Sequence, residues 1–257
     1  MTRPYILAEA TQKQIAERKI EVAVLPWGAT EAHNMHLPYG TDTITVTMIG
    51  ERICQKAYEN GAEVCLLPSI PFGCNSNLLS FPMTMNMNPT TQLAIIRDVV
   101  GSLEAHGVRK LVILNGHGGN DFGFILRELY GCGVFITSVH WYSVAKEPCG
   151  HLIENKGGEH ADEVETSWAL YLFPELVEPL EVADDGAVRP FRIDAFNEPW
   201  ARLTRPWERL TTQSGYGNPH KATAEKGRQW IDVSVDRLAK FLIDLAAAEM
   251  DDTFPMA

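Results

Sequence analysis

The sequence of 257 residues lacks any hydrophobic run that approaches the roughly 18–20 apolar residues of a membrane-spanning helix. Its first residues, MTRPYILAEATQKQ, have neither the apolar centre nor the small-residue cleavage site of a secretion signal. Cysteine is scarce as well, because the five residues include no Cys-x-x-Cys pair and their odd number does not suit a disulfide framework. We therefore expect a cytoplasmic protein whose thiols stay reduced.

Basic residues are too few for a partner of strong negative charge. The 22 Lys and Arg residues stand against 33 Asp and Glu, which gives a formal net charge of −11. Nucleic acids and anionic membranes favour basic surfaces, so both are excluded as main partners. Residues 189–209 are rich in arginine and tryptophan, and in so acidic a chain we assign them to packing between subunits.

Short apolar segments alternate with helical patterns over the first two-thirds of the chain. The patterns predict strands at 22–25, 64–67, 111–114 and 134–139, with helices at 41–60, 89–106 and 122–130. The strand at 22–25 should end at Pro26, and two of the helices should end at Gly61 and Gly107. Unbroken apolar strands that alternate with helices predict an α/β fold whose mostly parallel sheet is covered on both faces.

The last third of the chain has weaker periodicity. Residues 179–220 contain many prolines, arginines and tryptophans and predict an irregular lid or interface segment, because such a length is far above that of an ordinary loop. Helical order returns over residues 222–249. With no repeat and no linker, residues 1–257 are expected to form one layered domain.

The loop over residues 28–42, just beyond the first predicted strand, collects metal-binding side chains. Glu31, His33, His36 and Asp42 lie within twelve residues, and carboxylates with imidazoles form a donor set that zinc, manganese and iron accept. Glu31 and His33 would point to the same side of an extended stretch. Asp42 has two oxygens and could bridge two ions, although a carboxylate near a helix start also serves as an N-cap.

The segment Asn115-Gly116-His117-Gly118-Gly119-Asn120 follows the strand at 111–114. It lacks the Lys-Ser/Thr of a phosphate loop and the spacing of a dinucleotide fingerprint. Glycines on both sides of His117 allow the backbone to approach a ligand and leave amide donors open. His117 is therefore a candidate metal ligand, and Gly118 and Gly119 are candidate pocket residues.

A third group of polar residues lies at 157–167. If a helix starts near Ala161, Glu165 shares its apolar face with Trp168. A carboxylate on such a face is costly to bury unless it is paired or bound to a metal. Glu159 and His160 precede this helix and are candidates for proton transfer, with helix capping as the alternative.

Together these segments resemble the creatininase (creatinine amidohydrolase) family. The matching blocks are Gly28-x-x-Glu31-x-His33-x-x-His36-Leu37-Pro38 through Thr41-Asp42, Phe81-Pro82-x-Thr84, Asn115–Asn120, Glu159-His160-Ala161-x-Glu163-x-Glu165-Thr166-Ser167, and Gly217-Asn218-Pro219 with residues 222–227. The resemblance implies a layered α/β metal-dependent hydrolase that assembles as a homo-oligomer, often a hexamer. It assigns the metal ligands to Glu31, His33, Asp42 as the bridging carboxylate, and His117. It also assigns the proton-handling role to His160, with Glu159 beside it.

Three positions depart from the family pattern. Creatininase carries an acidic metal ligand where this chain has Gly119, so either Glu165 supplies that carboxylate or the second metal site is weak or empty. Many relatives have histidine at the position of Leu78 and glycine at that of Met83. We expect both positions, with the nearby Ser76 and with His36, to shape the substrate pocket. Creatinine is therefore not the expected substrate.

The sequence thus predicts a hydrolase that acts on an amide-like C–N bond of a small polar substrate. One or two zinc, manganese or iron ions would lower the pKa of a bound water from 15.7 toward about 7 and polarise the carbonyl. His160 would give a proton to the leaving group, and Glu165 would orient the water or complete the metal shell. Two alternatives stay open: hydrolysis of a C–C bond in a cyclic keto-sugar, as in one known relative, and a catalytically retired protein that binds a metal or ligand.

Overall fold

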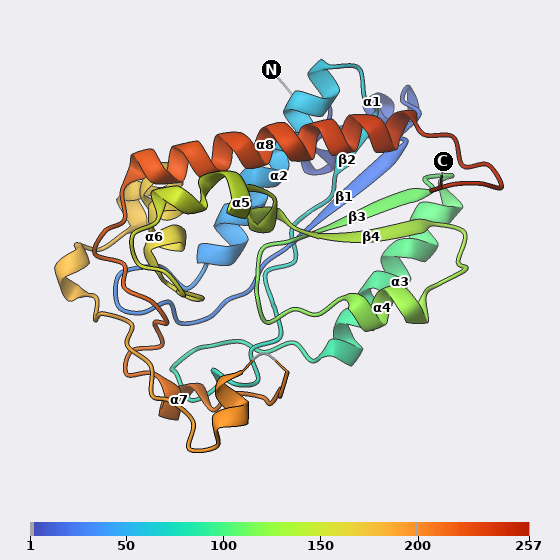
Figure 1. Cartoon of the computed structure of the whole chain (residues 1–257). Helices are drawn as coiled ribbons and strands as arrows, with labels where there is room; N and C mark the ends of the chain where they lie inside the picture. The colour runs from blue at the N-terminus through green and yellow to red at the C-terminus, as the bar shows by residue number, and fades with distance from the viewer. Residues whose placement is uncertain (1–2, 199, 257) are drawn as a thin grey trace.

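A four-stranded parallel sheet lies at the centre of the protein (Figure 1). The structure is a computed structural model that describes residues 3–198 and 200–256. In the order β2-β1-β3-β4, the strands are Val64–Leu66, Val22–Trp27, Lys110–Asn115 and Phe135–His140. All three pairings are parallel, so the carboxyl ends of the strands meet at one edge of the sheet. The predicted α/β fold is confirmed.

Helices of very different length surround this sheet. They are α1 (Gln12–Ala16), α2 (Thr41–Glu59), α3 (Pro89–Ala105), α4 (Gly123–Glu128), α5 (Lys146–Cys149), α6 (Glu163–Leu172), α7 (Trp207–Leu210) and α8 (Ala224–Ala247). Short 3₁₀ helices occur at Leu7–Glu9, Trp141–Ala145, Gly150–Leu152, Pro174–Leu176, Leu180–Val182 and Asp194–Asn197. Over the part of the chain that the structure describes, no helix is long and apolar enough to cross a membrane.

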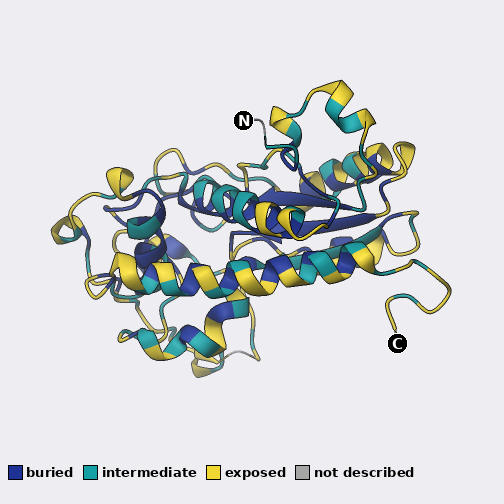
Figure 2. Cartoon of the chain, turned by 90° about the horizontal axis from the view of Figure 1, so that it is seen from above, coloured by how far each residue is buried: buried dark blue, intermediate teal, exposed yellow. Residues whose placement is uncertain are grey.

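Alternate residues of the strands enter two separate hydrophobic cores. One core, beneath α2 and α8, contains Val24, Ile49 and Leu242, and the other, beneath α3 and α4, contains Leu25 and Ile96. Strands β1, β2 and β3 are buried along their whole length and β4 is half-buried, while α8 exposes residues along its outer side (Figure 2). Because both faces of the sheet are covered, the buried central parts of β1 and β3 carry apolar residues on both sides, which explains their unbroken hydrophobic pattern.

Strand β1 continues through Pro26 to Trp27, beyond the end that the sequence predicts. The N–H of Leu67 donates to the carbonyl of Val24, and the N–H of Ile70 donates to that of Pro26. This edge of β1 therefore faces the chain that has just left β2. Proline lacks an N–H and is tolerated where the ladder of hydrogen bonds is already interrupted.

The segment over residues 179–220 packs across the end of the molecule near the carboxyl ends of the strands. In its described parts, residues 179–198 and 200–220, regular structure is limited to α7 and two short 3₁₀ helices. Trp207 and Leu210 form a small hydrophobic cluster with Leu78, which belongs to the loop after β2. The segment is therefore held against its own chain by apolar contacts.

The close approach of α8 to α6 depends on Gly227. A Cβ at this position would lie 1.9 Å from the carbonyl oxygen of Ser167, so Gly227→Ala would force the two helices apart. Overpacking of this kind typically costs about 1–3 kcal/mol, and we expect a loss of that size in the free energy of unfolding, measured by urea denaturation.

Gly101→Ala is the matched control, because Gly101 lies exposed in α3 and a Cβ there would have no described atom within 4 Å. Replacing an exposed helical glycine with alanine stabilises a helix by roughly 0.5–1 kcal/mol. If Gly227→Ala stabilised the protein in the same way, the close helix contact would be contradicted.

Candidate metal centre

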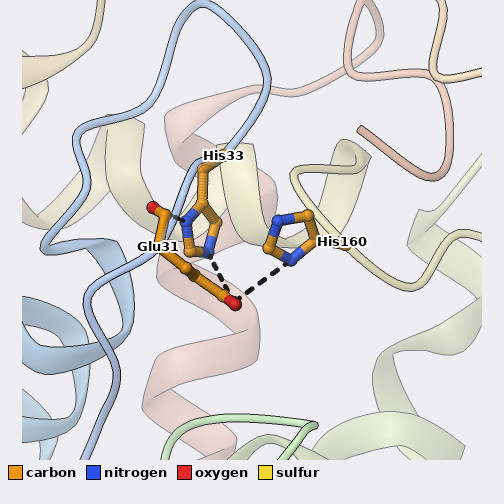
Figure 3. Close-up of side chains that lie close together, drawn as sticks. All are labelled: Glu31, His33 and His160. Atoms are coloured by element: carbon orange, nitrogen blue, oxygen red, sulfur yellow. Dashed lines mark hydrogen bonds and ion pairs between the residues drawn. The ribbon is translucent and has the colours of Figure 1, made fainter. Parts of the chain in front are cut away.

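Acidic and imidazole side chains from four parts of the chain meet at the carboxyl edge of the sheet. They come from the loop after β1, the first turn of α2, the loop after β3, and the start of α6. The group consists of Glu31, His33, Asp42, His117, His160 and Glu165. Figure 3 shows His33 and His160 turned toward the carboxylate of Glu31. Open α/β sheets bind their ligands at this edge.

Each of the three histidines is held by a backbone carbonyl. His33 Nδ1 lies 3.1 Å from the carbonyl of Glu31, and His160 Nε2 lies 2.8 Å from that of Ala32. His117 Nε2 lies 3.3 Å from the carbonyl oxygen of Cys74. A carbonyl only accepts, so these ring nitrogens are the donors and the opposite nitrogens are left unprotonated in the neutral rings. Histidines that bind metals are oriented in this way.

The free ring nitrogens face the carboxylates. His117 Nδ1 lies 3.2 Å from Glu31 Oε1 and 2.9 Å from Asp42 Oδ2. His33 Nε2 lies 3.2 Å from Asp42 Oδ1 and 3.9 Å from Glu165 Oε2. The two oxygens of Asp42 therefore face different histidines, as a bridging ligand requires. Asp42 does not cap α2, because the N-cap position is Gly40.

This donor set suits two divalent cations that share one carboxylate. One group of donor atoms comes from Glu31, Asp42 and His117, and a second comes from His33, Asp42 and Glu165. In each group the atoms lie within 4.8 Å of one another. Within the described chain, the buried Glu31 Oε2 accepts no hydrogen bond, and a carboxylate oxygen is costly to bury in that state. A cation would satisfy it.

Without cations, protons balance the carboxylates. Burial disfavours a charged imidazole ring, but the nearby carboxylates, above all that of Asp42, raise the pKa of His33 to about 10. The carboxylates of Glu31 and Asp42 likewise raise the pKa of His117. Burial lowers the pKa of His160 to about 4, and the charge of His33 adds to this effect. Burial raises the pKa of the Glu165 carboxyl to about 8. Cations must displace the protons of His33 and His117, so their binding strengthens as the pH rises.

A cavity of about 380 Å³ opens over the carboxylates and His117. Its walls are largely aromatic, with Tyr142, Trp168, Trp207 and Trp230. Further lining residues differ in polarity and include Asn77, Leu78, Gly118, Gly119, Ser143, Lys146, Glu159 and Arg205. The cavity is therefore small, and aromatic, polar and charged residues all contribute to its lining.

The irregular segment 179–220 also positions His160. The N–H of His160 donates to the carbonyl of Tyr216, and the N–H of Tyr216 donates back to that of His160, at 3.1 and 2.8 Å. Arg205 pairs with Glu159 at 2.7 Å. Glu159 is thus engaged at the rim of the cavity, with its side chain 47% exposed, whereas His160 faces the carboxylates.

Three expected pocket residues do not line the cavity. The chain turns at Asn34, whose φ is +52°, and the ring of His36 is buried with Nε2 2.8 Å from Thr166 Oγ1. Ser76 is exposed, and the chain presents the two residues after it to the cavity instead. Met83 is 78% exposed with φ +58°, a backbone conformation that explains why glycine suits this position.

Several lining residues were not identified from the sequence. Lys146 and Trp230 stand in segments without a recognisable motif. Arg205 and Trp207 belong to the stretch rich in arginine and tryptophan, and the structure places both against the cavity of their own chain. Packing of this stretch between subunits stays a prediction. The arginine and tryptophan content of this stretch indicated that it packs against something, but composition alone does not reveal which surface the side chains face.

Comparison with known proteins identifies the family. A model of the creatininase family, described as creatinine amidohydrolase, matches residues 8–242. The chain therefore belongs to the creatininase family of metal-dependent hydrolases. The resemblance found in the sequence is confirmed.

Relatives of the chain have more than one activity. A creatinine amidohydrolase from Pseudomonas putida is 27% identical, covering 93% of this chain and 96% of that protein. A 3-dehydro-scyllo-inosose hydrolase from Thermotoga maritima is also 27% identical, covering 91% and 81%. The crystal structure of a candidate creatinine amidohydrolase from Bacteroides fragilis NCTC 9343 has a TM-score of 0.86 and 37% identity, covering 98% of this chain and 100% of that one.

Gly119 is required by the packing around His117. A Cβ at Gly119 would lie 2.4 Å from His117 Nε2 and 2.5 Å from the carbonyl oxygen of Cys74, the two atoms whose contact orients the ring. We expect Gly119→Ala to weaken zinc binding about 10–100-fold, as loss of a supporting contact does at other metal sites. Competition with a chromogenic chelator measures this affinity.

Gly118→Ala serves as the control, because the nearest described atom to a Cβ there is the hydroxyl of Tyr142 at 3.9 Å. Its zinc affinity should equal that of the wild type. Equal affinities for both variants would show that His117 does not depend on Gly119.

Proposed function

We propose that the chain hydrolyses an amide-like C–N bond in a small polar substrate other than creatinine. In this proposal two divalent cations are held by Glu31, His33, Asp42, His117 and Glu165. The observation that carries the proposal is the orientation of the histidines, each with one nitrogen on a backbone carbonyl and the other toward a carboxylate.

The proposed reaction divides its tasks between the cations and the chain. Two bound divalent cations supply Lewis acidity toward a carbonyl oxygen and lower the pKa of water. His160 Nδ1 faces the centre, 3.6 Å from Glu31 Oε1, where it would accept a proton from the attacking water and then give that proton to the leaving nitrogen. The amides of Gly118 and Gly119 lie beside the cavity, where they would stabilise the developing oxyanion.

The same geometry explains how Glu165 can take the place of the acidic ligand that creatininase carries at the position of Gly119. Glu165 Oε2 lies 3.9 Å from His33 Nε2 and also accepts a hydrogen bond from the N–H of Ala161 at 2.6 Å. With no room for a side chain at Gly119, Glu165 is the carboxylate that completes the second group of ligands. We therefore assign Glu165 to the second cation.

The shape of the cavity supports a small substrate with a flat part. Leu78 is buried and packs with Trp207, so this side of the cavity is closed by apolar atoms where many relatives have histidine. Trp168 and Trp230 face the cavity as well. Cyclic amides and related ring carbonyl compounds fit such a site better than extended chains.

Hydrolysis of a C–C bond in a cyclic keto-sugar is the second candidate, and the Thermotoga maritima relative favours it. The same water and cations would act, and only the bond differs. Product analysis separates the two: a released amine or formate indicates C–N cleavage, whereas ring opening without either indicates C–C cleavage. A protein that binds cations but hydrolyses neither class would be a retired member of the family.

We expect the protein, purified without chelator, to carry about two divalent ions per chain, measured by elemental mass spectrometry. Glu165→Gln should reduce this to about one, because the second group loses its charged ligand, and His117→Ala should remove metal and activity together. Glu175→Gln, on an exposed 3₁₀ helix away from the cavity, is the control. Two ions retained by Glu165→Gln would contradict the assignment of Glu165.

His160→Ala should keep the metal content of the wild type and lower kcat about 10²–10⁴-fold, since it removes a proton donor and no proposed ligand. The rate is measured on whichever compound the wild type hydrolyses in a panel of cyclic amides, N-formyl compounds and cyclic keto-sugars. An unchanged rate, or loss of metal in the same variant, would show that His160 has a different role.

We also propose that residues 1–257 act as one domain and that copies assemble into a homo-oligomer. Large apolar side chains stay exposed on two neighbouring loops, with Met35 and Leu79 both 55% exposed and Met83 78% exposed. A hydrogen bond from the Tyr39 hydroxyl to the carbonyl of Pro82 joins these loops. Light scattering should give a multiple of 28.6 kDa, six-fold if the family resemblance holds, and a monomer at micromolar concentration would overturn the proposal.

A further inference from the structure

The cavity of the metal centre is lined by two cationic side chains in different states. Arg205 forms an ion pair with Glu159 at 2.7 Å. Its guanidinium carbon also lies over the rings of Trp207 and Tyr216, 4.8 and 5.6 Å from their centroids. Lys146 also lines the cavity, at the start of α5. Within residues 3–198 and 200–256, no carboxylate lies within 4.0 Å of its ammonium group, and the protein provides no hydrogen-bond acceptor for it.

The backbone that carries Lys146 is firmly placed. Its neighbours Ala145 and Cys149 are buried in the core beneath α8, and Trp230 Nε1 donates to the carbonyl of Tyr142 at 3.1 Å. The lysine stem therefore starts from a fixed point, while the side chain itself is exposed beside the cavity and its ammonium group is free to move. A lysine ammonium is a compact charge on such a flexible stem.

We propose that Lys146 binds a carboxylate group of the substrate. This inference rests on the proposed function, in which the reacting carbonyl lies at the metal centre; the carboxylate would then occupy the other end of the cavity. Of the Arg205 and Lys146 side chains that line the cavity, only Lys146 has no ion-pair partner among the described residues. Its charge is therefore available to bind a substrate carboxylate. The substrate class becomes a small cyclic or amide compound that carries a carboxylate.

The charge of the site agrees with an anionic substrate. The chain as a whole is acidic, with a net charge of −11, and without cations the protons of His33 and His117 only balance the carboxylates of the centre, so nothing there attracts an anion. Two divalent cations more than neutralise the three carboxylates of Glu31, Asp42 and Glu165. Lys146 then adds a further positive charge to the residues that line the cavity, and opposite charges attract each other.

Binding of simple carboxylates to the zinc-loaded protein tests this proposal. Succinate, glutarate and adipate are compared with the monocarboxylates of the same chain length, butyrate, valerate and hexanoate, by calorimetry. One carboxylate of each compound can reach the metal centre, and only the dicarboxylates offer a second group to Lys146. At least one dicarboxylate should bind about tenfold more tightly than its matched monocarboxylate, which is the effect of one added hydrogen bond between charged groups.

Three variants assign the preference to Lys146. Lys146→Met should abolish it, and Lys146→Arg should retain most of it because the charge is kept. Lys13→Met, on α1 away from the cavity, should behave as the wild type. A preference that survives Lys146→Met, or no preference in the wild type, would overturn the proposal.

Zinc content is measured in every sample, which separates the two hypotheses. A wild-type protein that binds no zinc would overturn the proposed function and this inference together. A zinc-loaded protein without any preference for dicarboxylates would overturn the assignment of Lys146 alone.

Discussion

Three carboxylates held together out of water are the constraint on which the rest of this structure depends. Glu31 and Asp42 are buried, at 1% and 3% exposed, and the Glu165 side chain is 17% exposed. Carboxylates this close together repel each other unless positive charge lies between them. His33 and His117 provide that charge as protons, and cations can replace it. Backbone carbonyls fix the rings, so the arrangement exists before any ligand binds.

The parallel sheet makes this arrangement possible. Strands β1 and β3 are neighbours in the sheet although about ninety residues separate them in the chain, so their following loops meet at one edge. Close backbone packing then sets the positions: Gly119 leaves room for the ring of His117, and Gly227 lets α8 approach α6, which carries Glu165. A methyl group at either glycine would shift the ligands that the sheet brings together.

The residues that line the cavity have different origins. The carboxylates and histidines come from motifs that the family shares, whereas Lys146 comes from a very short helix and Arg205 and Trp207 come from the irregular segment. Relatives with different activities can therefore share one centre and differ in the surrounding walls. For this chain, the lining includes both the apolar Leu78 and the cationic Lys146.

The sequence by itself determined the α/β class, the position of each strand to within a few residues, and the six side chains of the centre, because apolar runs and ligand motifs are local patterns. Glu165 is one of these six, and its place on an apolar helix face is a local property as well. Only the tertiary structure showed that His36, Ser76 and Met83 turn away from the cavity and that Lys146, Arg205 and Trp207 face it. The direction of a side chain in a loop depends on single backbone angles, such as the positive φ of Asn34, and on contacts with distant residues, and neither leaves a periodic signal in the sequence.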